Sequence, residues 1–390
     1  MPVEEKGRKM GADTTKLYYY TRADTMRSIL TSGMFWATNI LYMNDSEEYL
    51  NGLREIRGIM ERYKSLDFRD VQVLDNLIHT PDPHIFTISF CTNGDLLSQW
   101  CVYARESGVN LELDFSLIKV DEDHPGTFFC PRDCKDADEI DVAAPLKPVI
   151  YFTRNAMLEK VSRKQVYKRT SEIIERINAL GLHSGKDGAE EKISELAAQI
   201  KRYEFSAEQE WRLVFNMTEH TVEYKKTPLF YREQDSILKP FIKVAVSKQD
   251  KGTGLRPVPW PVTAITVGPG YNQDQVFQSL RYFLNFGNYI RKDDADSRIY
   301  GLNLYLDKVE ARCRPLFKRQ TGLSHMISDY KAKIKATPNL IKTGSMLHEL
   351  ARTIKENLVQ KFPRCVEALA SVELTNGGIV LQKSDIPYIY

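Results

Sequence analysis

Alternation of apolar and polar residues predicts β-strands across the first 300 residues of the chain. The alternating segments are rich in β-branched and aromatic side chains. The predicted strands cover residues 16–21, 34–38, 84–91, 108–115, 126–130, 147–152, 211–215, 241–246 and 264–267. Few of them alternate singly with helices, so the pattern favours an α+β fold with a mixed or antiparallel central sheet over a doubly wound fold.

Apolar residues that recur every three or four positions predict helices between and after these strands. The predicted helices cover residues 24–32, 45–64, 70–79, 156–180, 189–203, 273–286, 302–318, 324–335 and 345–359. Gly33 supplies a left-handed stop for the first helix, and Asp45 with Glu48 has the pattern of a capping box. Asp95 is expected to cap a short helical turn that carries Trp100.

The order of these elements predicts a sheet domain with two helical additions. Residues 1–16 are expected to form a polar leader. Residues 17–300 are expected to form the α+β domain, with a helical hairpin inserted at about residues 155–204. Residues 301–372 then form a helical block, and a turn and strand within residues 373–390 return to the main sheet.

Charge is divided unevenly between these parts. The 390 residues include 54 Lys and Arg against 52 Asp and Glu, a net charge of +2. Residues 301–390 carry 14 basic and 8 acidic residues, a net charge of +6, so the first 300 residues carry 40 basic and 44 acidic residues, a net charge of −4. Such an asymmetry marks either a basic appendage that binds a partner or the solvated face of helices.

The composition is typical of a globular protein with two or three domains. With 42% hydrophobic and 27% charged residues, the chain is neither a disordered tail nor collagen-like. No apolar run approaches the roughly 18 residues of a membrane-spanning helix, and the start lacks a basic segment followed by an apolar one. The sequence therefore predicts a cytoplasmic protein that does not bind a membrane.

The cysteines and histidines predict neither a disulfide framework nor a metal site. Six cysteines in 390 residues are sparse and fit reduced thiols. His124, Cys130 and Cys134 form one cluster, but a structural zinc site usually needs a second close pair of ligands. The histidines include no His-Glu-x-x-His arrangement, so no metal is expected.

Two carboxylates separated by one residue form the sharpest chemical feature of the sequence. Glu208 and Glu210 stand at the mouth of a predicted strand, where residues two apart project to the same side, so both can face one pocket. Close carboxylates raise each other's pKa and divide labour, one stabilising a cationic transition state while the other takes a proton. The alternative is an exposed strand edge paired with Arg212, or with Lys201 and Arg202.

An ordered set of short motifs resembles a family of bacterial proteins. In chain order, the motifs are Leu17-Tyr18-Tyr19-Tyr20-Thr21, Ile29-Leu30-x-x-Gly33, Tyr42-Met43-Asn44-Asp45-x-x-Glu48, Ser89-Phe90-Cys91, Ser98-Gln99-Trp100-x-x-Tyr103, Phe205-x-x-Glu208-x-Glu210-Trp211-Arg212 and Val267-Gly268-Pro269. Together they resemble the bacterial domain of unknown function 2971 over about residues 17–271, a family without firmly assigned chemistry. Ser384-x-Ile386-Pro387-Tyr388 resembles its closing strand, which makes residues 302–372 an insertion. The resemblance makes Asn44 and Asp45 candidate site residues, and a helix cap is the alternative for both.

A more distant resemblance is to ADP-ribosyltransferases, in which a later strand opens with Glu-x-Glu. It implies that Glu210 grips the ribose 2′-hydroxyl of NAD and stabilises the oxocarbenium ion, while Glu208 orients or deprotonates the acceptor. Ser89 takes the position of a Ser or Thr on a central strand. Other positions that the resemblance implies are Tyr19, Tyr20 or Arg22 for the nicotinamide ribose, and Trp100 or Tyr103 for stacking on nicotinamide.

The first strand departs from the ADP-ribosyltransferase pattern, and the two aromatic residues have an alternative role. The first strand carries tyrosines where ADP-ribosyltransferases have His or Arg, so Arg22 would have to substitute. Trp100 and Tyr103 lie three apart on a predicted helix, where the alternative is that they anchor the core.

The leading hypothesis is an ADP-ribosyltransferase-like enzyme that cleaves NAD and passes ADP-ribose to a protein, a nucleic acid or water. Its setting would be a bacterial defence system or a toxin effector. One alternative is a nucleic-acid-binding component of a bacterial defence or stress system, without catalysis, whose basic C-terminal helices contact phosphates. Another alternative is a protein-interaction module in which these helices bind a partner protein.

Overall fold

The computed structural model divides the chain into two compact units. It describes residues 16–43, 47–62, 68–81, 84–105, 108–120, 125–131, 140–152, 171–177, 189–217, 229–234, 236–250, 254–290, 294–316, 321–336, 343–376 and 378–386. Unit 1 comprises Met1–Gly33, Asn93–Leu117 and Val258–Tyr390, and unit 2 comprises Met34–Thr92 and Ile118–Pro257. Both units combine strands with helices, so the protein has an α+β fold.

Five strands in the described part of unit 1 are paired in the order β15-β16-β14-β4-β1. The strands are β1 (Lys16–Thr21), β4 (Val109–Asp114), β14 (Val262–Val267), β15 (Val372–Leu374) and β16 (Val380–Lys383). Their pairings are antiparallel except for β14 with β16, which is parallel. The expected strand near the C-terminus therefore exists as β16, and it pairs with a strand more than 100 residues earlier in the chain.

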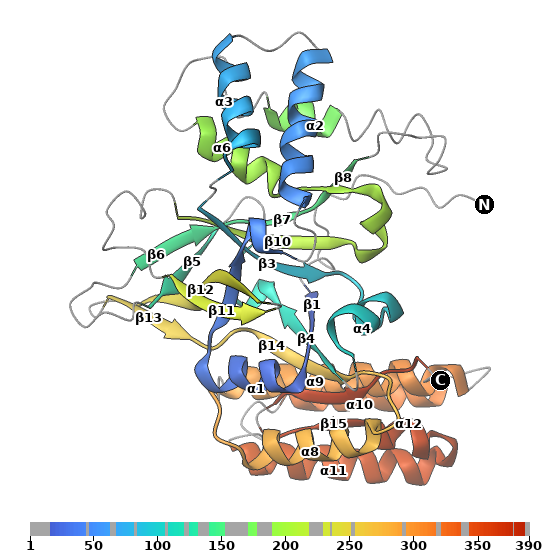
Figure 1. The fold of residues 1–390 in the computed structure, drawn as a ribbon. Helices are drawn as coiled ribbons and strands as arrows, with labels where there is room; N and C mark the ends of the chain where they lie inside the picture. Colours follow the sequence, from blue (N-terminus) through green and yellow to red (C-terminus); the bar gives the residue numbers. More distant parts are fainter. Residues whose placement is uncertain are drawn as a thin grey trace. The chain divides into compact units, whose positions relative to one another are not determined.

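Five helices of unit 1 lie together in Figure 1. They are α8 (Gln273–Phe286), α9 (Ala295–Cys313), α10 (Thr321–Ala336), α11 (Gly344–Lys361) and α12 (Val366–Ala370). Two others, α1 (Ala23–Ser32) and α4 (Leu97–Tyr103), lie apart from this group and contact β4 and β1. Leu302, Leu306, Leu347 and Ile354 belong to one buried core with Ala264 of β14, so α9 and α11 pack on the sheet through apolar side chains.

Unit 2 contains a larger set of paired strands, in the order β3-β2-β12-β5-β6. The strands are β2 (Phe35–Asn39), β3 (Ile85–Cys91), β5 (Gly126–Cys130), β6 (Ile140–Ala144), β7 (Leu146–Pro148), β10 (Glu210–Asn216), β11 (Phe230–Gln234), β12 (Ile237–Asp250) and β13 (Gly254–Val258). β10 pairs with β3 and β7, and β11 and β13 pair with β12. β8 (Ile150–Phe152) and β9 (Ile200–Arg202) form a separate parallel pair.

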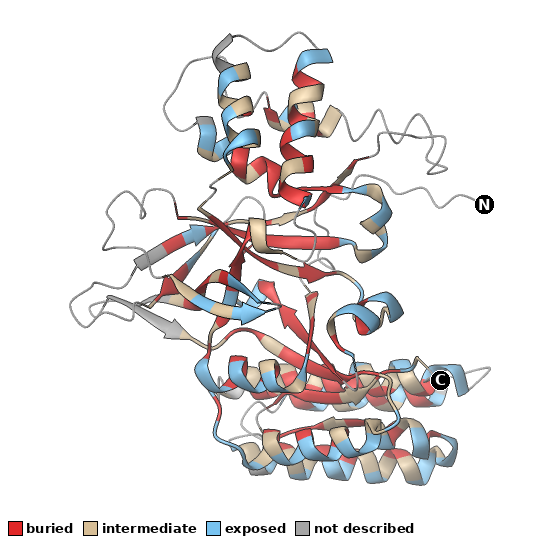
Figure 2. Ribbon diagram, in the orientation of Figure 1, coloured by how far each residue is buried: buried red, intermediate tan, exposed pale blue. Residues whose placement is uncertain are grey.

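Three helices of unit 2 pack together on one side of these strands (Figure 1). They are α2 (Glu48–Arg62), α3 (Phe68–His79) and α6 (Ala189–Ala197), followed by a 3-10 helix at Tyr203–Glu208. Tyr49, Leu53 and Ile56 of α2 share a buried core with Ile193 of α6 and Ile200 of β9. In Figure 2, buried residues lie along the strands and on the inner sides of the helices.

Many elements agree with the sequence. The helix predicted at residues 273–286 is α8 with the same limits, and Gly33 ends α1 in the left-handed region with a φ of 69°. Met26, Ile29 and Leu30 form the buried stripe of α1. The strands predicted at residues 16–21 and 84–91 are β1 and β3.

Two sequence predictions are wrong. The helix predicted over residues 189–203 ends at Ala197, and Ile200–Arg202 is strand β9, because this segment pairs with β8. Asp95 does not cap α4: Leu96 holds the cap position, and the Asp95 carboxylate instead accepts a hydrogen bond from Trp100 Nε1 at 2.7 Å.

Other predictions concern residues that the structure describes only in part or not at all. Of the helix predicted at residues 156–180, the structure describes residues 171–177, and these residues are helical. Asp45 of the expected capping box lies outside the described residues. Among the described helices, none combines the length and the apolar character needed to cross a bilayer.

Two glycines of α2 test how this helix packs. An added Cβ at Gly52 would lie 2.4 Å from the carbonyl oxygen of Ala197, whereas one at Gly58 meets nothing within 4 Å. We expect Gly52→Ala to lower the free energy of unfolding by about 1–3 kcal/mol through overpacking. Gly58→Ala should raise it by about 0.5–1 kcal/mol through helix propensity. Urea denaturation of both variants measures these values, and a stabilised Gly52→Ala variant would contradict the packing of α2.

Candidate functional site

Five charged side chains form a buried cluster in unit 2. Lys201 Nζ donates to Glu208 Oε2 and to Glu210 Oε2, each at 2.8 Å, and lies 3.5 Å from Glu48 Oε2. Arg212 donates from Nε to Glu210 Oε1 at 2.6 Å and from Nη2 to Glu48 Oε1. Three carboxylates thus surround two cations, so the fully ionised cluster carries one surplus negative charge.

The five members come from four local structures. Glu210 and Arg212 lie two apart on β10 and therefore share one face of the sheet. Lys201 lies on β9, and Glu48 lies in the first turn of α2, where a negative charge is favourable. Arg212 Nη1 also donates to the carbonyl oxygen of Ala198 at 2.6 Å, which joins the segment after α6 to the cluster.

Glu208 reaches the cluster through a turn. The sequence predicts that Glu208 and Glu210 converge because both lie on extended backbone, but Glu208 ends the 3-10 helix and only Glu210 belongs to β10. Between them, Gln209 has a φ of 45°, in the left-handed region that non-glycine residues rarely adopt. Gln209 Oε1 accepts a hydrogen bond from Thr92 Oγ1 at 2.5 Å. Strained backbone of this kind concentrates at functional sites.

The environment moves the pKa values of the two carboxylates in opposite directions. Burial would raise the pKa of Glu210, but the charges of Arg212 and Lys201 outweigh it and lower that pKa to about 2. Burial raises the pKa of Glu208 above its usual range, and Lys201 opposes this rise only in part. Burial would lower the pKa of Lys201 and Arg212, but Glu210 and Glu48 raise both. At neutral pH Glu210 is a fixed anion, and Glu208 is the member of the pair that titrates more readily.

Ser89 joins the same face of the sheet. In the antiparallel pairing of β3 with β10, Ser89 is opposite Arg212 and Cys91 is opposite Glu210. Residues directly opposite each other project to the same face, so Ser89 lies on the face that carries Glu210 and Arg212. Ser89 Oγ is buried and has no hydrogen-bond partner among the described residues. The three residues predicted to be catalytic therefore all lie in one region of unit 2.

Sequence reasoning missed some members of this site. Tyr151 accepts a hydrogen bond at Oη from the backbone N–H of Glu210 at 2.8 Å, and burial raises the tyrosine's pKa. Glu48 entered only as part of a helix cap, and Lys201 only as a surface partner of the carboxylates. Strand β9 brings Lys201 inside, and its pairing with β8 is a long-range contact without a local signal.

The aromatic residues predicted for cofactor binding belong to unit 1. Tyr20 and Trp100 are buried and meet edge to face, with ring centroids 4.6 Å apart. Tyr20 Oη donates to the carbonyl oxygen of Asn93 at 2.9 Å and accepts from the N–H of Leu96 at 2.8 Å. These contacts fix the segment that leads into α4, as the core-anchor alternative describes for Trp100.

The remaining predicted binding residues lie in unit 1 or outside the described residues. Tyr19 and Tyr103 are half-buried in unit 1. Arg22 is exposed and lies 3.4 Å from Asp24 Oδ1. Asn44 and Asp45 lie outside the described residues, so their roles stay predictions.

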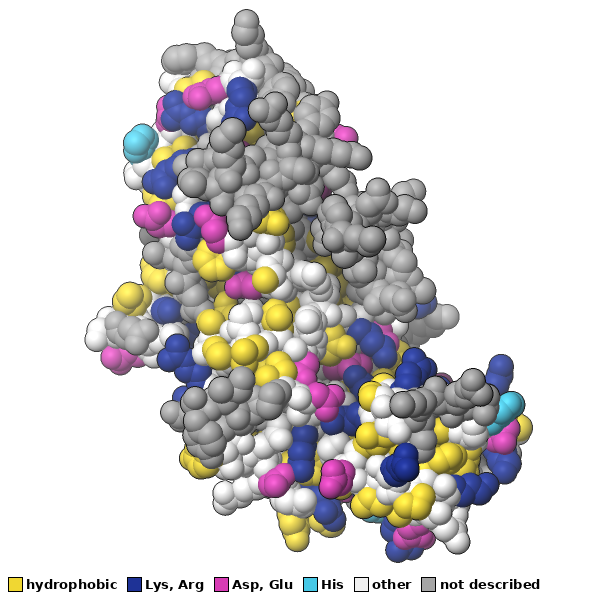
Figure 3. Space-filling model, turned by 90° about the vertical axis from the view of Figure 1, so that its right-hand side faces the viewer, with side chains coloured by type: hydrophobic (Ala, Val, Ile, Leu, Met, Phe, Trp, Pro, Cys, Tyr) yellow, Lys and Arg dark blue, Asp and Glu magenta, His cyan; other side chains and the backbone are white. Residues whose placement is uncertain are grey.

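The remaining observations concern possible metal ligands and the charged surface. Within the described ranges no three His, Cys, Asp or Glu side chains come together as a metal site; Cys130 is buried, and His124 and Cys134 lie outside those ranges. In the basic helices, Lys331 pairs with Asp307 and Arg352 pairs with Glu349. On the face shown in Figure 3, Lys and Arg side chains are interspersed with Asp and Glu side chains.

Comparisons with known proteins add no family. No protein-family model, no curated protein and no solved structure matches the chain. The resemblances to the domain of unknown function 2971 and to ADP-ribosyltransferases stay predictions from the sequence.

The lowered pKa of Glu210 predicts how acid affects stability. A carboxylate whose folded pKa is about 2, below its ordinary value of 4.5, stabilises the fold above about pH 4.5 and loses this effect as the pH falls toward 2. Glu210→Gln should therefore cost about 3 kcal/mol at pH 7, and the difference from wild type should shrink between pH 4.5 and 2.

Denaturant unfolding of both proteins at several pH values measures this difference. Glu204→Gln is the matched control, because Glu204 is exposed on the neighbouring 3-10 helix. It should change stability by less than about 0.5 kcal/mol at every pH. A constant difference between wild type and Glu210→Gln from neutral pH to strong acid would show that Glu210 is not held ionised.

Proposed function

We propose that the chain is an ADP-ribosyltransferase-like enzyme whose reactive carboxylates are Glu208 and Glu210. It cleaves the bond between nicotinamide and ribose in NAD and passes ADP-ribose to a macromolecule or to water. One observation carries the proposal: two carboxylates, separated by a residue in strained backbone, share Lys201 at 2.8 Å each. This arrangement supports a division of labour between two acids of different pKa.

The surplus negative charge of the cluster suits the transition state of this reaction. When the glycosidic bond breaks, its electron pair leaves with nicotinamide and positive charge develops on the ribose ring. Glu48, Glu208 and Glu210 oppose only Lys201 and Arg212, and fixed charges in a poorly solvated site act strongly. Glu210 supplies a permanent part of this charge because it stays ionised at neutral pH.

Glu208 is the carboxylate that meets the acceptor. Its side chain is 18% exposed, against 5% for Glu210. Glu210 also accepts hydrogen bonds at both oxygens, whereas the bond from Lys201 to Glu208 engages Oε2. In the proposed reaction the acceptor oxygen or nitrogen bonds to ribose C1′, and its proton passes to Glu208. Ser89 Oγ, on the face of the neighbouring strand, is a further hydrogen-bonding group for the substrate.

Nicotinamide release tests the proposal. The purified full chain is incubated with NAD, with and without candidate protein and nucleic-acid acceptors, and nicotinamide is quantified by mass spectrometry. Glu208→Gln should lower kcat at least about 100-fold, the usual contribution of a general base. Glu204→Gln should leave kcat within about twofold, because this exposed residue is outside the cluster. Absence of nicotinamide release by the wild type, or an undiminished rate in Glu208→Gln, would rule the mechanism out.

The pH dependence of the same reaction gives an independent test. A general base must be deprotonated, so the rate falls when the pH drops below its pKa. Since burial raises the pKa of Glu208, the acidic limb of the kcat/KM profile should lie above the ordinary 4.5. This limb should disappear from the residual activity of Glu208→Gln. If the acidic limb keeps its position in Glu208→Gln, another group is responsible for the titration.

A further inference from the structure

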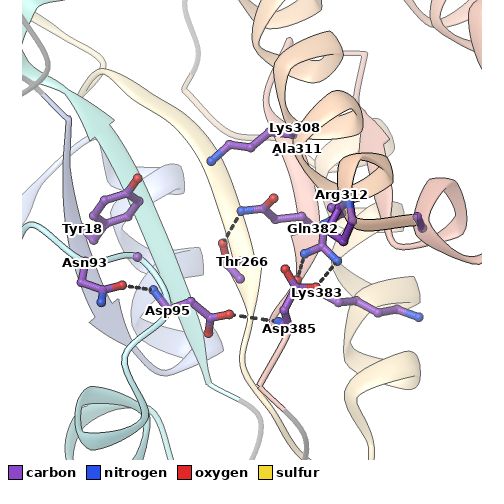
Figure 4. A pocket seen from close by; sticks show the side chains of 13 residues that line it. Tyr18, Asn93, Asp95, Thr266, Lys308, Ala311, Arg312, Gln382, Lys383 and Asp385 are labelled. Carbon is purple, nitrogen blue, oxygen red and sulfur yellow. Dashed lines mark hydrogen bonds and ion pairs between the residues drawn. The ribbon is translucent and has the colours of Figure 1, made fainter. Parts of the chain in front are cut away.

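Unit 1 contains a polar pocket of about 620 Å³ that uses none of the residues of the carboxylate cluster. Lys308 and Arg312 of α9 and Lys383 of β16 line one part of it, and Tyr18 of β1 and Asn93 line another. Figure 4 shows Tyr18 and Asn93 across the pocket from Gln382, Lys308 and Arg312. The Lys383 side chain points away from the pocket, and its Nζ donates to Asp274 Oδ1. The volume is within the range of small-molecule sites.

The sheet face beside the pocket is polar, and Thr266 and Gln382 of this face line the pocket. Asn110 and Glu112 alternate with apolar residues along β4, a pattern that ordinarily faces water. Here both side chains are buried. In register with Asn110 lies Thr266, followed by Gln382 on the next strand, and Gln382 Nε2 donates to Thr266 Oγ1 at 2.9 Å.

Helix α9 covers this polar face with charged side chains. Lys308 Nζ donates to Glu112 Oε2 at 2.6 Å, and Lys308 retains further donor hydrogens. Arg312 lies one turn later and also lines the pocket. Helix α9 therefore places two cationic side chains, Lys308 and Arg312, in the lining of the pocket.

One buried acceptor on this face has no partner. Asn110 is 0% exposed, and its Nδ2 donates to the carbonyl oxygen of Gly94, a residue that lines the pocket. Asn110 Oδ1 has no hydrogen-bond partner in the described part of the chain. An unsatisfied buried acceptor costs about 1–3 kcal/mol. Asn110 is in register with Thr266, which lines the pocket.

Arg312 is held by a carboxylate that an anionic ligand can replace. Its Nη1 donates to Ser371 Oγ at 2.9 Å and to Asp385 Oδ1 at 2.6 Å. The side chain of Asp385 is 73% exposed, so little free energy is needed to return this carboxylate to water. A phosphate group matches the planar guanidinium with two parallel hydrogen bonds.

We propose that this pocket binds a nucleoside monophosphate. Arg312 and Lys308 hold the phosphate, and the Tyr18 ring stacks on the base. Amide groups of Asn93 and Gln382 are placed to hydrogen-bond polar edges of the ligand. An inorganic anion alone would leave the side of the pocket that Tyr18 lines unoccupied. The proposal goes beyond the proposed function and is tested separately, because AMP has no nicotinamide bond to cleave.

Isothermal titration calorimetry of the full chain with AMP tests the pocket. Arg312→Gln should weaken AMP binding about tenfold by removing a charged phosphate contact. Asp385→Asn should strengthen it several-fold, because the competing carboxylate leaves Arg312. The matched controls are Lys331→Gln and Asp307→Asn, an ion pair of α10 and α9 outside the pocket lining, and both should bind AMP within about twofold of wild type.

Several outcomes would overturn the proposal. Absence of AMP binding at about 1 mM would remove the site. Inorganic pyrophosphate bound as tightly as AMP would show that the base makes no contact. Affinities unchanged in both Arg312→Gln and Asp385→Asn would place the bound nucleotide elsewhere. These outcomes are distinct from failure of the proposed function, which concerns nicotinamide release from NAD.

Discussion

The pairing of Arg212 with Glu48 and Glu210 is the interaction on which unit 2 depends. Arg212 is 1% exposed and has no accessible neutral form, so its charge must be paired inside the protein. Its partners lie in α2 and β10, and Ala198 follows α6. Loss of one partner would leave a buried charge at a cost of about 3–5 kcal/mol. The positions of these three elements are therefore tied to the ionisation of two carboxylates.

The same pairing creates conditions for chemistry. Cations that hold Glu210 ionised also leave Glu208 less strongly paired, since Lys201 is shared between the two acids. The left-handed Gln209 places both carboxylates at Lys201 although only Glu210 belongs to the strand. Structural need and reactivity are thus linked, because the buried network that stabilises the sheet also separates the pKa values of two neighbouring acids.

The periodicity of apolar residues and the stop signals of the sequence predicted some elements correctly. Gly33 stops α1, and α8 has the predicted limits. The helix expected at residues 189–203 failed because nothing in the sequence after Ala197 breaks a helix, and only pairing with β8 makes Ile200–Arg202 a strand. The Glu208 and Glu210 pair was found, but its burial was not, since Glu48 and Lys201 reach it through long-range packing. The pocket of unit 1 was missed because its lining comes from β1, α9 and β16, which lie far apart in the sequence.

One network of charged side chains holds Glu208 and Glu210 at different pKa values. Carbon-13 NMR of carboxyl-labelled glutamates titrates both groups in the folded protein, with assignments from Glu208→Gln and Glu210→Gln. We predict that the Glu210 signal stays that of a carboxylate throughout the range in which the protein is folded, because its pKa is about 2. The Glu208 signal should titrate above the ordinary value of 4.5. Titration of both signals together near 4.5 would show that the network does not separate the two pKa values.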